Sequence, residues 1–148
     1  MTHNEPSEAR PFIVPIFVPH AGCPHQCAFC NQSSITGSHS VPAGREVRRQ
    51  IETFLSYRRK LRQPVQIAFF GGNFLGIQSH AINGLLSEAT AYVVAGRADS
   101  IRFSTRPDTV DRQRLASIQN YPVATIELGV QSMNNRVLKH SNRGHTME

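Results

Sequence analysis

The chain has 148 residues, a length that allows one domain with a hydrophobic core. Hydrophobic residues make up 39% of it and charged residues 18%, and no apolar run approaches the roughly 20 residues of a bilayer-spanning helix, so the composition excludes a membrane span. The polar segment 1–11 lacks the apolar core of a secretory signal, and we expect a flexible leader on a cytoplasmic protein. The net charge of +6 suits a polyanionic partner such as tRNA, but it fits a merely soluble basic protein nearly as well.

Apolar strands and amphipathic helices alternate along the chain from residue 12 onward. Short β-rich apolar runs predict strands at 12–18, 65–70, 100–104 and 124–130. Apolar positions at three- and four-residue steps predict helices at 46–61, 79–93, 111–118 and 134–140. This alternation indicates parallel strands joined by right-handed crossovers, and hence an α/β sheet or barrel. Because ligands bind at the carboxyl ends of such strands, the four loops that follow them should converge on one site.

All three cysteines lie within eight positions, in Gly22-Cys-Pro-His-Gln-Cys-Ala-Phe-Cys30. Their odd number and tight spacing argue against a disulfide framework and indicate metal ligands at Cys23, Cys27 and Cys30. The C-x3-C-x2-C spacing lets three thiolates reach a single inorganic core and leaves one iron with an open coordination position. From the cysteines alone, the alternative is a structural Cys3His zinc site completed by His20 or His25.

Glycines and polar residues follow the other three strands. Phe69-Phe-Gly-Gly-Asn-Phe74 ends the second strand with two glycines, where the missing Cβ lets another group approach the backbone closely. Phe103-Ser-Thr-Arg-Pro-Asp108 supplies hydroxyls, a guanidinium and a carboxylate after the third strand. On the fourth strand, the two-residue alternation predicts that Glu127 and Gln131 share a face. Arg106 is a candidate ion-pair partner for Glu127. A structural ion pair and direct contact of these residues with a ligand are equally compatible with the sequence.

The cysteine motif resembles the signature of the radical S-adenosylmethionine (SAM) superfamily. Together with Ser-Thr-Arg-Pro-Asp, Glu-Leu-Gly-Val-Gln-Ser-Met and Arg143-Gly-His-Thr146, it resembles the branch that contains the catalytic subunit of the tRNA-modifying Elongator complex, over about residues 12–146. The resemblance implies a [4Fe–4S] cluster on the three cysteines, with SAM on the open iron. It further implies cofactor-binding roles for these residues: Phe29, Gly71, Gly72, Asn73, Phe74, Ser104, Arg106 and Gln131. Asn73 stands where the family usually has Thr or Glu.

The resemblance implies that one electron from the reduced cluster cleaves SAM homolytically and that the 5′-deoxyadenosyl radical abstracts hydrogen from a substrate. It also implies an electron donor such as flavodoxin or ferredoxin. tRNA is a candidate substrate, as are a small metabolite and a tetrapyrrole. Family cores have six βα units and four are visible here, so we expect residues 12–148 to be the N-terminal part of a partial TIM-type barrel, truncated at the C-terminus. The rival interpretations are a zinc-stabilised nucleic-acid-binding module and a catalytically inactive fragment.

The first predicted helix and the segment after it form the most basic part of the chain. The basic residues are Arg48, Arg49, Arg58, Arg59, Lys60 and Arg62. Runs of this kind are usually a solvated helix face, and we prefer that interpretation to a phosphate-binding patch. The histidines His3, His39, His80, His140 and His145 share no face or ligand spacing, and we assign them no chemistry.

Overall fold

The computed structural model of the chain describes residues 10–19, 23–25, 27–30, 40–59 and 63–147. Four parallel strands form one sheet in sequence order: β1 (Phe12–Val18), β2 (Val65–Gly71), β3 (Ser100–Thr105) and β4 (Val123–Leu128). The helices are α2 (Gly44–Ser56), α3 (Ser79–Val94), α4 (Arg112–Ile118) and α5 (Asn135–His140), with 3-10 turns η1 (Phe74–Gly76) and η2 (Pro107–Thr109). The predicted parallel α/β fold is confirmed. None of the helices in these ranges is long and apolar enough to cross a bilayer.

Most element boundaries fall within one residue of the prediction, and three do not; the first is the start of the helix predicted at 46–61, which begins at Gly44. The helix predicted at 46–61 ends at Ser56, and Leu61, its last predicted apolar position, lies outside the described residues. The strand predicted at 124–130 ends at Leu128, and Gln131 beyond it has a left-handed backbone with φ 72°. The helix starts are well marked, because the side chains of Asp111 and Asn134 accept backbone N–H bonds as N-caps of α4 and α5.

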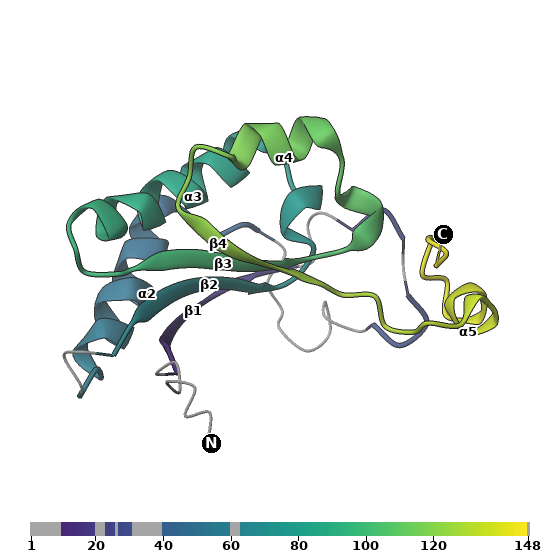
Figure 1. Cartoon of the computed structure of the whole chain (residues 1–148), viewed down its shortest axis with the longest axis horizontal. Helices are drawn as coiled ribbons and strands as arrows, with labels where there is room; N and C mark the ends of the chain where they lie inside the picture. Colours follow the sequence, from purple (N-terminus) through teal and green to yellow (C-terminus); the bar gives the residue numbers. More distant parts are fainter. Residues whose placement is uncertain (1–9, 20–22, 26, 31–39, 60–62, 148) are drawn as a thin grey trace, which may run out of the picture.

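One face of the sheet packs against helices and forms the core (Figure 1). The inward positions alternate along the strands, and the helices add their own apolar stripes. The fully buried side chains of this core include Val14, Ile16, Ile67, Phe69, Ile101 and Phe103 from the strands, Ile51 from α2 and Leu86 from α3. Burial of each large side chain contributes about 1.5–3 kcal/mol.

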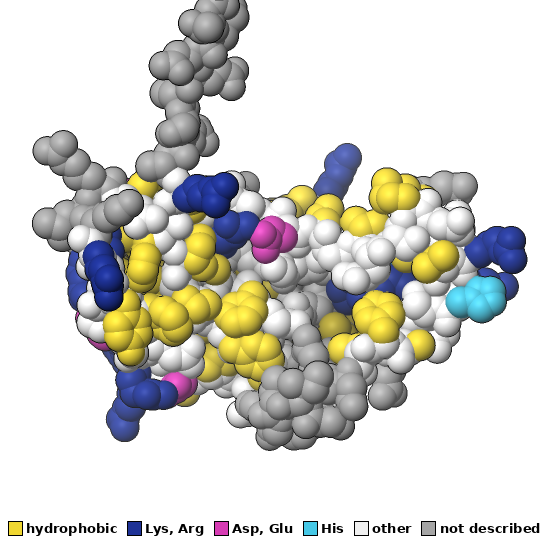
Figure 2. All heavy atoms as spheres, turned by 90° about the horizontal axis from the view of Figure 1, so that it is seen from below, with side chains coloured by type: hydrophobic (Ala, Val, Ile, Leu, Met, Phe, Trp, Pro, Cys, Tyr) yellow, Lys and Arg dark blue, Asp and Glu magenta, His cyan; other side chains and the backbone are white. Residues whose placement is uncertain are grey.

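The opposite face of the sheet carries no helix of the described chain, and it is divided in character (Figures 1 and 2). On β1 and β2, the rings of Phe17 and Phe70 pack edge to face at 5.7 Å. On β3 and β4, the corresponding positions carry Arg102, Ser104 and Glu127. Hydrophobic side chains thus gather on this face beside a charged and polar region, as the yellow, blue and magenta atoms of Figure 2 show.

All four strands point their carboxyl ends toward the same edge of the sheet, where α5 also lies (Figure 1). Two glycines there bring β2 against β1. Gly71 has φ +106°, and a Cβ on it would lie 2.3 Å from the Phe17 ring. A Cβ on Gly72 would lie 2.7 Å from the carbonyl oxygen of Pro19. The sequence predicts that another group approaches this glycine pair closely. The end of β1 is such a group.

Replacing Gly71 with alanine should destabilise the chain. We expect Gly71→Ala to lower the free energy of unfolding by about 2 kcal/mol or more, because the strained φ and the overlap with Phe17 act together. Gly84→Ala on α3 is the matched control: nothing lies within 4 Å of its added Cβ. This control should raise stability by up to about 1 kcal/mol, the helix-propensity difference. Urea unfolding of both variants checks the prediction, and equal effects would contradict it.

Candidate functional site

A cavity of about 190 Å³ lies at the carboxyl edge of the sheet and brings the predicted loops together. Its lining comprises Cys23, Cys27, Cys30, Gly71, Gly72, Asn73, Ser104, Thr105, Arg106, Gly129, Gln131 and Arg143. The cysteine loop and the motifs at the ends of the other three strands therefore meet at one place, as the parallel arrangement requires. Thr105, Gly129 and Arg143 were not among the predicted site residues.

The three cysteines of the loop are free thiols. Cys27 is buried and the other two are partly exposed. The turn is closed by the backbone N–H of Cys30, which donates to the carbonyl of Cys27 at 3.0 Å, and α5 is tied to the loop by Ala28 N–H donating to the Ser141 carbonyl at 3.0 Å. Burial raises the pKa of the Cys23 thiol above its usual value, as do the neighbouring sulfurs, while the charge of Arg106 acts in the opposite direction.

Two buried guanidinium groups contact the sulfur of Cys27. Nη1 of Arg106 and Nη1 of Arg143 each donate to Cys27 Sγ at 3.4 Å, and the two residues are only 3% and 7% exposed. Buried cations need an anionic partner, and a thiolate supplies one. Since a cysteine that ligates a metal is deprotonated, this donor set fits a metal-bound sulfur at Cys27.

The three cysteines line one cavity, as the ligands of an iron–sulfur cluster would. Within the described parts of the chain, no group of three or more His, Cys, Asp and Glu side chains is arranged to hold a metal ion. Of the two histidines named for the zinc alternative, His25 faces Asp108 with Nε2 3.9 Å from a carboxylate oxygen, and His20 lies outside the described residues. In a cluster, each cysteine binds a different iron, so its ligands line a cavity instead of converging on a point.

The predicted pairing of Arg106 with Glu127 is wrong. Nε and Nη2 of Arg106 donate to the two carboxylate oxygens of Asp108 at 2.8 and 2.7 Å. Glu127 instead accepts hydrogen bonds from Arg102 and from the hydroxyl of Ser104. The reason is the direction of the side chains: Arg102 and Ser104 share the open face of β3 with Glu127 on β4, whereas Arg106 lies beyond the end of β3 and turns toward the cysteines.

Asn73 holds the end of β3 to the loop after β2. Its buried Oδ1 accepts hydrogen bonds from the hydroxyls of Thr105 and Thr109 at 2.7 and 2.8 Å, and from the backbone N–H of Arg106 at 3.1 Å. Thr105 Oγ1 in turn accepts from the backbone N–H of Leu75 at 3.2 Å. The resemblance implies a cofactor-binding role for Asn73, but its side-chain oxygen accepts from these protein donors, and its backbone carbonyl accepts from the N–H of Gly76 at 3.0 Å.

The remaining predicted residues take different places. Gln131 lines the cavity, although its left-handed backbone means that strand alternation with Glu127 does not apply. The Phe74 side chain is 1% exposed and stacks between Phe69 and Phe103, with centroid distances of 5.1 and 4.5 Å, so any cofactor contact would come from its backbone. Phe29 is 58% exposed and lines a separate hollow beside Val137. Their cofactor roles stay predictions.

The charged groups away from the cavity are mostly paired. On α2, Arg48 lies 3.5 Å from a Glu88 oxygen, and Arg49 pairs with Glu46 at 2.7 Å, as a solvated helix face would. Lys60 and Arg62 lie outside the described residues. Near the cysteine cavity the situation differs, because both ring nitrogens of His145 and Nε of Arg143 are buried without a hydrogen-bond partner among the described residues.

A parallel α/β sheet whose strand ends surround three cysteines and two buried arginines defines a class of protein that holds a thiolate-bound metal group at its carboxyl edge. The model of the radical SAM superfamily matches residues 17–148, and the chain belongs to this superfamily.

The relatives that the chain matches point to one branch of the superfamily. Elongator complex protein 3 of Drosophila melanogaster is 25% identical over 129 residues, covering 70% of this chain and 23% of that protein, and the mouse protein is 24% identical over 130 residues, covering 70% and 24%. An uncharacterised protein of Methanocaldococcus jannaschii is 25% identical over 147 residues, covering 90% of this chain and 44% of that protein. The chain thus spans less than half the length of these relatives.

A solved structure shows the same fold. The archaeal Elp3 of Methanocaldococcus infernus, with an N-terminal deletion, superposes with a TM-score of 0.57 at 18% sequence identity. The match covers 93% of this chain and 33% of the archaeal one. The predicted arrangement of four βα units, a part of the radical SAM barrel, is therefore confirmed at the level of the fold.

Removal of the Asn73 amide should destabilise the fold at the site. We expect Asn73→Ala to cost about 2–4 kcal/mol of unfolding free energy, because buried hydroxyl and amide donors left without an acceptor cost about 1–3 kcal/mol each. Asn83→Ala on the exposed side of α3 is the matched control and should change stability by less than about 0.5 kcal/mol. Denaturant titration of the two variants provides the measurement, and similar losses would argue against this role.

Asp108 should contribute to stability at neutral pH and lose that contribution in acid. Burial alone would raise the pKa of Asp108, but hydrogen bonds and charge from Arg106 dominate and lower it below the usual value of about 3.9. A depressed folded pKa gives stability that is complete above about pH 5 and is lost as the pH falls through the folded pKa. We expect Asp108→Asn to be less stable at pH 7 and to show a flatter decline below about pH 5. Parallel stability curves from urea titrations would contradict this.

Proposed function

We propose that this chain is the cluster- and SAM-binding part of a radical SAM enzyme, with a [4Fe–4S] cluster on Cys23, Cys27 and Cys30. The observation that carries the proposal is the contact of two buried arginines with Cys27 in a cavity lined by all three cysteines. Membership of the superfamily supports the same chemistry. When bound, the reduced cluster supplies one electron to SAM, which splits into methionine and a 5′-deoxyadenosyl radical that abstracts hydrogen from a substrate.

The residues of the chain prepare this site in three ways. Arg106 and Arg143 donate to Cys27 Sγ and would offset the negative charge of thiolate ligands in a bound cluster. Gly71 and Gly72 present main-chain atoms to the cavity without a Cβ, so that their backbone is the candidate partner of the SAM amino group. Ser104 and Gln131 add a hydroxyl and an amide, which suit the ribose and methionine parts of SAM.

The substrate, the compartment and the electron source belong to the same proposal. The net charge of +6 and the similarity to Elongator complex protein 3 favour tRNA as the substrate. Three reduced thiols in a cluster loop suit the cytoplasm, where thiols are kept reduced. An acidic flavodoxin or ferredoxin is the proposed source of the electron.

Anaerobic reconstitution tests the cluster. We expect the chain to take up about four iron and four sulfide per molecule, with broad visible absorption, and the electron paramagnetic resonance spectrum of the reduced form to change when SAM is added. Cys27→Ser should lose most of the iron, whereas Ser117→Ala on the exposed side of α4 should retain it. Stoichiometric zinc without iron–sulfur absorption would overturn the proposal in favour of a zinc-stabilised module.

A further inference from the structure

Two segments that build the surface around the cysteines contain no acidic residues. Asp and Glu are absent from residues 9–45, which include the cysteine loop, and from 128–147, which include α5. The second segment carries Arg136, Lys139 and Arg143. The carboxylate that lies nearest the loop in the structure, on Asp108, is held with both oxygens by Arg106. The surface over the cysteine loop is therefore electropositive.

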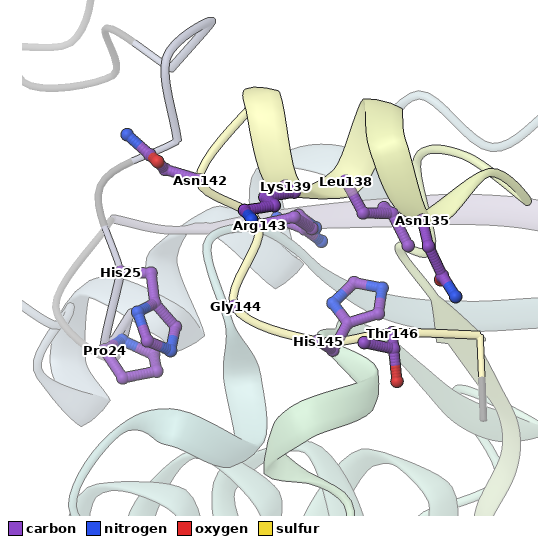
Figure 3. Close-up of a pocket in the computed structure, with 10 residues that line it drawn as sticks. All are labelled: Pro24, His25, Asn135, Leu138, Lys139, Asn142, Arg143, Gly144, His145 and Thr146. Atoms are coloured by element: carbon purple, nitrogen blue, oxygen red, sulfur yellow. The ribbon is translucent and has the colours of Figure 1, made fainter.

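A second cavity, of about 710 Å³, lies on this surface (Figure 3). Pro24 and His25 of the cysteine loop form one wall, and α5 with the residues after it forms the other. Only Arg143 belongs to the linings of both this cavity and the cysteine cavity. We define the cluster-loop face as the exposed residues Pro24, His25, Lys139, Asn142 and Gly144.

The two walls of the cluster-loop face are held together. The Ala28 N–H donates to the Ser141 carbonyl at 3.0 Å. The imidazole of His25 packs directly against Gly144. A Cβ on this glycine would lie 2.0 Å from His25 Cδ2. Gly144 also has φ +79°, which few other residues tolerate. The face thus presents a continuous, hollowed surface whose members are fixed relative to the cysteines.

We propose that the cluster-loop face is the docking surface for a small acidic one-electron carrier protein of the flavodoxin or ferredoxin class. This inference rests on the proposed function, because only a redox-active cluster requires such a partner. His25 lies between Cys23 and Cys27 in the chain, so a carrier on this face would contact the loop that carries the cluster ligands. The carrier is oxidised by one electron and the cluster is reduced by the same electron, with no bond made or broken.

Charge and position together favour a carrier over RNA. An acidic protein and an RNA are both attracted to Lys139 and its neighbours. A substrate, however, must reach the reacting carbon of SAM, which the proposed function places in the cysteine cavity. Among the described residues, the cavity at the cluster-loop face shares only Arg143 with the cysteine cavity. The face meets the requirement of an electron carrier, which is proximity to the loop alone.

Charge reversal on the face tests the inference. The probe is purified oxidised bacterial flavodoxin, titrated calorimetrically against the reconstituted chain at low salt. We expect Lys139→Glu to weaken binding about tenfold or more, and added salt to weaken the parent complex. Arg59→Glu, an exposed change of the same charge before the amino end of β2, is the matched control and should stay within about twofold of the parent. Asn142→Asp is a second variant on the face, at a left-handed position (φ 53°) where Asp is tolerated, and it should weaken binding in the same direction.

Two further readouts separate the failure of this inference from the failure of the proposed function. Iron content and reduction by dithionite are measured on each variant, and both should match the parent. Absence of a cluster from the parent chain would refute the proposed function itself. A dithionite-reducible cluster combined with flavodoxin binding that Lys139→Glu leaves unchanged would overturn the docking surface alone. Loss of binding to a tRNA transcript in that variant, with flavodoxin binding intact, would assign the face to RNA instead.

Discussion

The site depends on one buried cation, the guanidinium of Arg106. It donates to Cys27 Sγ, to both oxygens of Asp108 and to the backbone carbonyl of Arg143, and so connects the cysteine loop, the turn after β3 and the segment after α5. These segments lie far apart in the sequence and share no hydrogen-bonded ladder. Removing one partner of a buried ion pair strongly destabilises a fold, because the remaining charge is left desolvated and unpaired. The position of Cys27 is therefore linked to the integrity of two other loops, which is the rigidity that a metal ligand requires.

The backbone around this cation is fixed by a second, neutral network. Asn73 Oδ1 collects donors from Thr105, Thr109 and the Arg106 backbone, so the end of β3 cannot move without breaking buried hydrogen bonds. Directly beneath it, Phe74 stacks on Phe103 in the hydrophobic core. The motif after β2 thus combines two functions. Its glycines admit close backbone contacts, while its Asn and Phe attach the loop to the neighbouring strand and to the core.

Hydrophobic period and turn chemistry were enough to predict the four strands and most helix boundaries, because each strand is a short apolar run bounded by polar or glycine residues. The residues at the strand ends were harder to place. Pairing of Glu127 depends on the register between β3 and β4, and register brings Arg102 and Ser104 to it while Arg106 turns away. Because Gln131 has a left-handed backbone, the alternation of side chains between the two faces of β4 does not extend to it. Arg143 was visible as part of a motif, but its contact with Cys27, across 116 positions of sequence, arises only from the tertiary fold.

The distribution of charge explains why net charge alone was weak evidence about a partner. On the helical side and the open face, several arginines pair with carboxylates: Arg48 with Glu88, Arg97 with Glu52 and Arg102 with Glu127. Such pairs contribute little to a long-range field. Around the cysteine loop, Asp108 is paired with Arg106. The two segments that build the surface, 9–45 and 128–147, contain only basic and neutral side chains. The surface beside the cysteine loop therefore carries the positive charge of Arg136 and Lys139 without a carboxylate from its own segment, while the buried Arg143 contacts Cys27 beneath it.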